Sequence, residues 1–170
     1  MQDKPTIGEI ASSQLPRDGA FLPLAMDRYE VGDELERSES WVVFRVWDRL
    51  LQRELAIRTV PESLRDNAEL LHAFCQEGQT LCQWQHPGLL PIYDLGTLPD
   101  GRPSWVTKFI AGQTLAQLLQ QESTGRRDVS PYLPIFDRVC QTLAYVHRSG
   151  WLHLDLKPSN ILVADLGEVY

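Results

Sequence analysis

The stretch HLDLKPSNIL, residues 153–162, decides how this sequence is interpreted. It holds a histidine, an aspartate, a lysine and an asparagine, at His153, Asp155, Lys157 and Asn160. A carboxylate can accept the proton of a hydroxyl group, an ammonium group can neutralise phosphate charge, and a carboxamide oxygen can bind Mg²⁺. Phosphoryl transfer depends on positioning and charge stabilisation, so this set of side chains suits that reaction. The alternative, a polar loop without chemistry, would rarely combine these four residue types in this order.

Helical and strand patterns surround this loop. Before it, residues 132–149 carry apolar side chains on one helical face, and Gly150 stands where a glycine would end a helix. After it, residues 161–163 and 168–170 predict a β-hairpin that is cut off in its second strand. Upstream, periodicity and turn residues predict strands at 29–36, 41–48, 53–60, 89–96 and 103–109 and helices at 67–84 and 114–122. The short connectors between the first three strands favour an antiparallel meander, so the predicted class is α+β.

Composition narrows the partners and the compartment. The formal net charge of -7 argues against a nucleic acid or an anionic membrane, because both attract clustered Lys and Arg. No window approaches the ~18 apolar residues of a membrane span, and the amino-terminal end lacks the apolar run of a signal peptide. The 3 cysteines, without close pairing in sequence, fit reduced thiols in a cytoplasmic protein. Residues 1–28 are rich in Pro, Ser, Gly and charge, which predicts a flexible leader.

The segment 153–162 resembles the protein-kinase catalytic loop, H-R-D-L-x-x-x-N, and Lys157 two residues after the aspartate is similar to the Ser/Thr branch. The resemblance extends back to Tyr29. Ala56-Ile57-Arg58 resembles the V-A-I-K of strand three, residues 86–93 resemble the H-P-N-I-V segment, and residues 106–115 resemble the hinge and the start of the next helix. The last segments are most similar to bacterial members of the family.

The resemblance implies a protein-kinase-like fold that binds ATP and Mg²⁺. A five-stranded antiparallel N-lobe with one helix would span residues 29–109, and an incomplete helical C-lobe would span residues 110–170. Asp155 would be the catalytic base, Lys157 the contact to the γ-phosphate, and Asn160 a Mg²⁺ ligand. Around the adenine ring, the nucleotide would contact Leu35, Val43, Ala56 and Leu162. Thr107 would be the gatekeeper, and the backbone of Lys108 and Ile110 would bind the edge of the adenine. Arg58 would pair with Glu77 in place of the usual Lys–Glu pair.

The parts that handle phosphate depart from the family pattern. Glu36, Ser38 and Trp41 occupy the glycine positions of the loop whose backbone N–H groups approach phosphate. The carboxylates of Glu36 and Glu39 would lie near a polyanion, and like charges ~4 Å apart cost about 1 kcal/mol in water and about 4 kcal/mol near a protein surface. Arg58 replaces the strand-three lysine with a larger, planar group. We therefore expect weak binding of ATP.

Two further departures concern regulation and completeness. Leu154 replaces an arginine that in the family usually pairs with a phosphorylated activation loop, so we expect that mode of regulation to be absent. Tyr170 is the tenth residue after Asn160, whereas the Asp-Phe-Gly metal ligand of the family lies roughly a dozen residues after that asparagine. We expect the main Mg²⁺ ligand and most of the helical lobe to be missing from this chain.

These features predict a Ser/Thr-protein-kinase-like protein that is inactive as this chain alone. The reaction of the family is ATP-dependent phosphoryl transfer to Ser or Thr of a protein substrate. Two alternatives stay open: a pseudokinase that acts as a scaffold or binding module for a protein partner, and a gene fragment without function. Because the helix at 132–149 would lack its covering helices, we also expect self-association through its apolar face.

Overall fold

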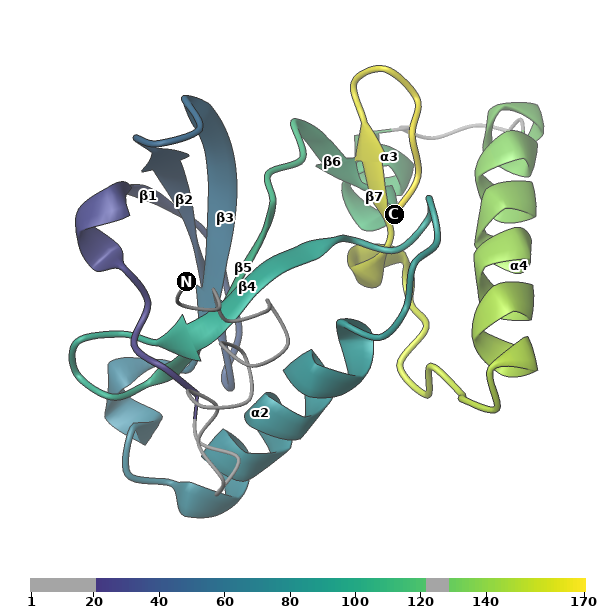
Figure 1. Ribbon diagram of the computed structural model, residues 1–170. Coiled ribbons are helices and arrows are strands. Elements are labelled where there is room, and N and C mark those ends of the chain that lie inside the picture. Colours follow the sequence, from purple (N-terminus) through teal and green to yellow (C-terminus); the bar gives the residue numbers. More distant parts are fainter. Residues whose placement is uncertain (1–20, 122–128) are drawn as a thin grey trace, which may run out of the picture.

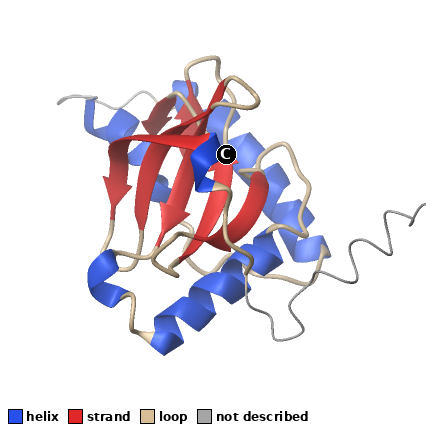
Figure 2. Ribbon diagram, turned by 60° about the vertical axis from the view of Figure 1, so that its left-hand side comes forward, coloured by secondary structure: helices blue, strands red, loops and turns tan. Residues whose placement is uncertain are grey.

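The computed structural model describes residues 21–121 and 129–170, which form an α+β fold (Figure 1). Five antiparallel strands make the main sheet in the order β1-β2-β3-β5-β4, and Figure 2 shows them side by side. Their bounds are β1 Tyr29–Arg37, β2 Val42–Asp48, β3 Arg53–Thr59, β4 Ile92–Thr97 and β5 Pro103–Lys108. The predicted five-stranded antiparallel sheet is therefore confirmed.

Helix α2, Ala68–Leu81, covers one face of this sheet. It begins after Asn67, whose side chain accepts a hydrogen bond of 3.1 Å from the N–H three residues on, as an N-cap does. The ring of Phe74 stacks on Trp105 of β5, with centroids 4.4 Å apart. Gly78 permits this close approach, because a Cβ there would lie 2.4 Å from the indole nitrogen of Trp105. Packing against one tryptophan thus explains a glycine inside a helix.

The opposite face is covered by residues 22–28, which the sequence places in a flexible leader. Leu24 is buried against this face, and its N–H donates to the Thr97 carbonyl at 2.9 Å. Arg28 donates two hydrogen bonds, of 2.8 and 2.6 Å, to the carboxylate of Asp48 at the end of β2. An apolar sheet face needs cover, so these residues, including the 3₁₀ turn η1 (Met26–Arg28), belong with the sheet. The rest of the expected leader, residues 1–20, lies outside the described residues.

The carboxy-terminal part is built from shorter elements. Strand β6 pairs antiparallel with β7, and Val163 of β7 also pairs with Val169 across a turn at Gly167, whose φ is +88°. The hairpin predicted at the end of the sequence is therefore confirmed, whereas β6 was not predicted. The elements are β6 Gly112–Thr114, α3 Leu115–Gln121, η3 Ser130–Tyr132, α4 Leu133–Arg148, η4 Pro158–Asn160 and β7 Leu162–Ala164.

The predicted boundaries of several elements differ from the structure by one to three residues. The strand predicted at 89–96 begins only at Ile92, because the turn after α2 extends to Leu89, whose N–H donates to the His86 carbonyl at 2.9 Å. The helix predicted from residue 114 begins one residue later, since Thr114 completes β6. The 3₁₀ turn η2, Glu62–Leu64, joins β3 to α2.

The turn after α2 holds α4 against the rest of the molecule. The hydroxyl of Tyr145 accepts a hydrogen bond of 3.1 Å from the Gln85 N–H, and its ring stacks on His86 with centroids 5.1 Å apart. A Cβ on Gly88 would lie 2.0 Å from Oγ1 of Thr142, so a glycine is required for this approach. These contacts orient the helix that leads into segment 153–162.

Candidate active site

Segment 153–162 follows α4 after a short reversal of the chain. Gly150 has a φ of +82°, and its N–H donates to the His147 carbonyl at 3.0 Å, as expected for the glycine that ends a helix. Leu154 has a φ of +59°, which is uncommon for a residue other than glycine, and its side chain is 89% exposed. Backbone outliers of this kind cluster at functional sites, so the strain at Leu154 marks the segment as a candidate.

Asp155, Lys157 and Asn160 meet in this segment. The Lys157 Nζ lies 2.8 Å from Oδ2 of Asp155. The Asn160 Nδ2 donates to the same oxygen at 2.9 Å and to the Asp155 backbone carbonyl at 2.8 Å. Hydrogen bonds from Lys157 and Asn160 lower the pKa of Asp155, so this exposed carboxyl group is ionised at neutral pH. The structure therefore brings the three predicted catalytic residues together.

Two members of this trio carry oxygen atoms of the kind that bind metal ions. The carboxylate of Asp155 and the amide oxygen of Asn160 are the type of ligand that Mg²⁺ prefers. Within residues 21–121 and 129–170, no three His, Cys, Asp or Glu side chains are close enough to form a metal cluster. An ion bound here would need further ligands from water or from a phosphate.

The register of the main sheet places four of the predicted nucleotide-binding residues, Val43, Ala56, Arg58 and Thr107, in two rows. In the first row, Arg45, Ala56, Thr107 and Ile92 are successive partners on β2, β3, β5 and β4. Ala56 and Thr107 are 6% and 5% exposed. Leu35, also expected at the adenine ring, lies on β1 and is 44% exposed. The first row therefore provides a small, buried surface at the position expected for adenine.

The second row crosses all five strands. Glu36, Val43, Arg58, Trp105 and Leu95 are successive partners on β1, β2, β3, β5 and β4. Residues directly opposite one another share a face of a sheet, so Glu36, Arg58 and Trp105 lie on the same side. Desolvation raises the pKa of Glu36, and the charge of Arg58 opposes this shift. The row expected to bind phosphate thus contains a carboxylate as well as a guanidinium.

Aromatic rings enclose the Arg58 guanidinium. Its Cζ lies 4.5 Å from the ring centroid of Trp41 and 4.9 Å from that of Trp105, within cation–π range of both. Its Nη1 is 4.0 Å from Oε1 of Glu77 on α2, so the expected pair forms at the limit of ion-pair distance. Its Nε is buried and has no hydrogen-bond partner among the described residues. Burial lowers the pKa of Arg58, while Glu77 and Glu36 raise it.

The turn between β1 and β2 satisfies its own backbone groups. The hydroxyl of Ser38 accepts hydrogen bonds from the N–H groups of Ser40 at 3.2 Å and Trp41 at 3.1 Å. The Ser38 N–H donates to the Trp41 carbonyl at 2.9 Å, and Glu39 at the tip is exposed. Three of the N–H groups of this turn, those of Ser38, Ser40 and Trp41, are therefore already bonded inside it, whereas a glycine-rich loop offers such groups to phosphate.

The chain after β5 connects the sheet to the carboxy-terminal part. The N–H of Lys108 donates to the Pro91 carbonyl at 3.2 Å, and its Nζ donates to the Tyr170 hydroxyl at 2.5 Å. The Tyr170 hydroxyl raises the pKa of Lys108 through this bond. Ile110 and Leu162, expected at the edge and on one side of the adenine, are half-buried. Lys108 thus links the predicted hinge to the terminal hairpin.

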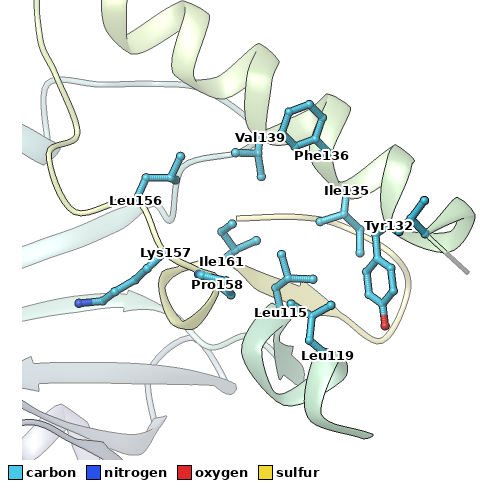
Figure 3. A pocket seen from close by; sticks show the side chains of 11 residues that line it. Leu115, Leu119, Tyr132, Ile135, Phe136, Val139, Leu156, Lys157, Pro158 and Ile161 are labelled. Atoms are coloured by element: carbon cyan, nitrogen blue, oxygen red, sulfur yellow. The ribbon is translucent and has the colours of Figure 1, made fainter. Parts of the chain in front are cut away.

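An apolar cavity of about 380 Å³ lies beside the catalytic segment, between α3 and α4 (Figure 3). In this view Leu115 and Leu119 of α3 face Ile135 of α4, and the ammonium of Lys157 points away from the cavity. Phe136 at its edge is 67% exposed. The cavity is therefore an open hydrophobic surface, separate from the polar groups of the catalytic segment.

The sequence model for "Protein kinase domain" matches residues 29–169. The chain belongs to the protein kinase family. Among curated relatives, the serine/threonine-protein kinase PknD of Chlamydia muridarum is 34% identical over 154 residues, which is 85% of this chain and 16% of that protein. PknD of Protochlamydia amoebophila is 29% identical over 158 residues, 87% of this chain and again 16% of the relative. This kinase chain is of the bacterial Ser/Thr type, and it spans only 16% of the length of these relatives.

Solved kinase structures share the fold. The PknI kinase domain of Mycobacterium tuberculosis superimposes with a TM-score of 0.69 at 22% identity, covering 84% of this chain and 57% of that one. The apo form of PpkA-294 gives a TM-score of 0.71, also at 22% identity, with 84% and 56% covered. The protein-kinase-like fold predicted from segment 153–162 is therefore confirmed, and this chain covers little more than half of each solved chain.

Sequence reasoning named Ser38 but did not predict its hydrogen bonds, and it missed Trp105 beside Arg58. Trp105 stacks on Arg58, and the hydroxyl of Ser38 occupies the N–H groups of the hairpin turn. Trp105 precedes Thr107, the predicted gatekeeper, by two residues, and residues two apart on a strand share a face. That spacing was the available signal that the indole would lie on the same face of the sheet as Thr107.

Proposed function

We propose that this chain is part of a pseudokinase, a relative of bacterial Ser/Thr kinases that acts by binding a protein partner rather than by transferring phosphate. The observation that carries the proposal is the position of Arg58 between Trp41 and Trp105. A cation that holds the phosphates of ATP has to present its N–H donors to them. In this chain the guanidinium lies against two indole rings and its Nη1 is 4.0 Å from Oε1 of Glu77, so contacts inside the protein hold it in place.

The residues present do not fit the phosphates of ATP. Lysine is a compact point charge, whereas arginine is a planar group that stacks on aromatic rings, so the exchange at position 58 changes the geometry as well as the size. In the hairpin turn, the N–H groups of Ser40 and Trp41 are taken up by the Ser38 hydroxyl. Support for the proposal therefore comes from two features, the replacement of the lysine by Arg58 and the hydrogen bonds inside the hairpin turn.

The second candidate function is phosphorylation of proteins by a longer form of this kinase. It is favoured by the arrangement of Asp155, Lys157 and Asn160, which matches the roles of base, phosphate contact and Mg²⁺ ligand that the family assigns to them. In that case ATP with Mg²⁺ would be the phosphate donor and a protein Ser or Thr the acceptor.

A labelling assay separates these functions. It measures transfer of labelled γ-phosphate from ATP, with Mg²⁺ or Mn²⁺, to a mixed protein substrate. The natural full-length protein would be compared with Asp155→Asn and with the control Asp165→Asn, which changes an exposed aspartate in the terminal hairpin. We expect equal background labelling in all three proteins. Labelling that Asp155→Asn abolishes and Asp165→Asn retains would refute the pseudokinase proposal in favour of the enzyme.

A cytoplasmic location is part of this proposal. Cys75, Cys82 and Cys140 are free thiols, as is usual in a reducing compartment. In the described part of the chain, no helix combines the length and apolarity needed to cross a membrane. Fractionation of cells that express a tagged full-length protein tests the location.

A further inference from the structure

A short connector, residues 109–111, joins the sheet to the carboxy-terminal part, between β5 and β6. Lys108 is the last residue of β5, where it pairs with Leu55 of β3, and its N–H also donates to the Pro91 carbonyl at 3.2 Å. The backbone of Lys108 therefore belongs to the sheet. Connectors of this kind are where one part of a protein turns relative to another, because a few residues can absorb the change in backbone angles.

Tyr170 belongs to the part on the other side of this connector. Its N–H and its carbonyl each form a 2.9 Å hydrogen bond with the backbone of Leu162 on β7. Strand β7 pairs in turn with β6, and the N–H of Asp165 donates to the Ala111 carbonyl at 3.0 Å. The backbone of Tyr170 is therefore fixed to the end of the connector that leads into the carboxy-terminal part.

The side chains of Lys108 and Tyr170 bridge the connector. The Lys108 Nζ donates to the Tyr170 hydroxyl at 2.5 Å and lies 4.7 Å from the centroid of the same ring. The hydrogen bond to Tyr170 raises the pKa of Lys108, and the nearby carboxylate of Glu168 raises it further. Oε2 of Glu168 is buried and has no hydrogen-bond partner among the described residues, so a cation beside it is favoured. The terminal hairpin thus holds the ammonium group of the last residue of the sheet.

A second contact between the two parts lies elsewhere, at the turn after α2. There the Tyr145 hydroxyl of α4 accepts the hydrogen bond of the Gln85 N–H, and its ring stacks on His86. Because the two contacts are made by different segments, loss of the bond between Lys108 and Tyr170 would leave the turn after α2 as a point about which the parts can rotate.

We infer that the hydrogen bond between Lys108 and Tyr170 acts as a latch, which holds the sheet and the carboxy-terminal part in one orientation, and that its opening lets the two parts turn about residues 109–111. The inference goes beyond the proposed function and does not depend on it. The latch fixes the position of segment 153–162 relative to the sheet whether or not phosphate is transferred. In a binding module, it would present both parts to a partner as one rigid surface.

Pulsed electron paramagnetic resonance on the full chain tests the latch, since it measures the distribution of distances between two nitroxide labels. One label is attached through Glu39→Cys, at the exposed tip of the turn between β1 and β2, and the other to the native, exposed Cys140 of α4. Cys75→Ala and Cys82→Ala remove the other thiols from this parent protein. We expect one dominant distance in the parent protein.

Two variants open the latch, and a third serves as the control. Lys108→Met and Tyr170→Phe should each raise the population of a second distance by about tenfold, the factor expected from losing one hydrogen bond to a charged group. The double variant should add nothing to either single one, because both remove the same bond. Tyr93→Phe removes the hydroxyl of a tyrosine that is 45% exposed on β4, and it should leave the distribution unchanged. If Lys108→Met fails to fold, Tyr170→Phe still tests the latch, since it keeps the ring.

Several results would overturn the inference. They are two equally populated distances in the parent protein, an unchanged distribution in both latch variants, and an equal change in Tyr93→Phe. A change in Lys108→Met but not in Tyr170→Phe would also overturn it, because the Tyr170 hydroxyl would then not be the partner that matters. Phosphate transfer in the labelling assay would refute the pseudokinase proposal and leave the latch unaffected.

Discussion

The sheet with α2 and the carboxy-terminal part bury their apolar side chains to very different extents. The sheet is packed on both faces, by Phe74 of α2 on one side and by Leu24 on the other. Among the described residues after Lys108, only Val146, Ile161 and Val169 are buried apolar residues. One part of this kinase chain therefore has its own core, whereas the other presents an open apolar surface.

This difference in packing indicates which part can fix the geometry of a ligand site. The rows that contain Ala56 and Arg58 belong to the well-packed sheet, so their geometry is set by a core of its own. Segment 153–162 follows α4, and the side chains of Leu133 and Phe136 on that helix are exposed. We therefore expect mutations to act on global stability in the first part and on association in the second.

The largest effect should come from removing the indole at the centre of the sheet's core. Trp105 is 2% exposed, stacks on Phe74 and contacts the Gly78 position, so Trp105→Ala should lower the free energy of unfolding by about 3–5 kcal/mol. Trp151→Ala is the matched control in the carboxy-terminal part, where the indole is 49% exposed, and should cost only about 1 kcal/mol. Urea denaturation followed by circular dichroism measures the free energy of unfolding of both variants. Equal losses of stability would contradict the difference in packing between the sheet and the carboxy-terminal part.

A smaller effect, with a defined pH dependence, should come from the pair that ties residues 22–28 to the sheet. The hydrogen bonds from Arg28, with those from the backbone of Leu51 and Leu50, lower the pKa of Asp48 from 3.8 to about 2. Because the folded value is below the unfolded one, the pair stabilises the fold above pH 3.8, and this contribution is lost as the pH falls through about 2. Asp48→Asn should therefore unfold at lower urea concentration at pH 7 and show a flatter acid dependence than the wild type.

The control for this pair is Asp66→Asn, which alters a carboxylate whose side chain is 93% exposed. Its urea midpoint should follow that of the wild type between about pH 7 and pH 2. An Asp48→Asn protein with the wild-type acid profile would show that residues 22–28 are not held by this pair.

The smallest effect on stability should come from the exposed side of α4. Phe136 is 67% exposed, so Phe136→Ser should change the free energy of unfolding by no more than about 0.5 kcal/mol. It should, however, reduce self-association in sedimentation velocity, because it interrupts the open apolar surface. Leu50→Ser, at a residue 71% exposed in the turn after β2, is the control and should leave association unchanged. A wild-type chain that sediments as a monomer would contradict the expected association.

Much of the fold was predictable because its signals are local. The strands at 29–36, 41–48 and 53–60 and the helix at 132–149 follow from periodicity and turn residues, which act over a few neighbours. The order of residue types in segment 153–162 was enough to predict a kinase-like site and to name Asp155 as its candidate base. The strand expected at 89–96 began late because a turn hydrogen bond competed with pairing, and such competition is not visible in periodicity.

The sequence by itself determined that an arginine stands in place of the strand-three lysine and that glycines are missing from the preceding hairpin. Only the tertiary structure decided what that arginine does. The register places Trp105 directly opposite Arg58, although 47 positions separate them, and the hairpin brings the ring of Trp41 to 4.5 Å from the guanidinium carbon. These contacts depend on long-range strand pairing and on α2 packing over one face, so no local pattern encodes them. The physical reason is that the environment of a charged side chain is set by the residues that the fold places next to it. These residues are distant in the sequence.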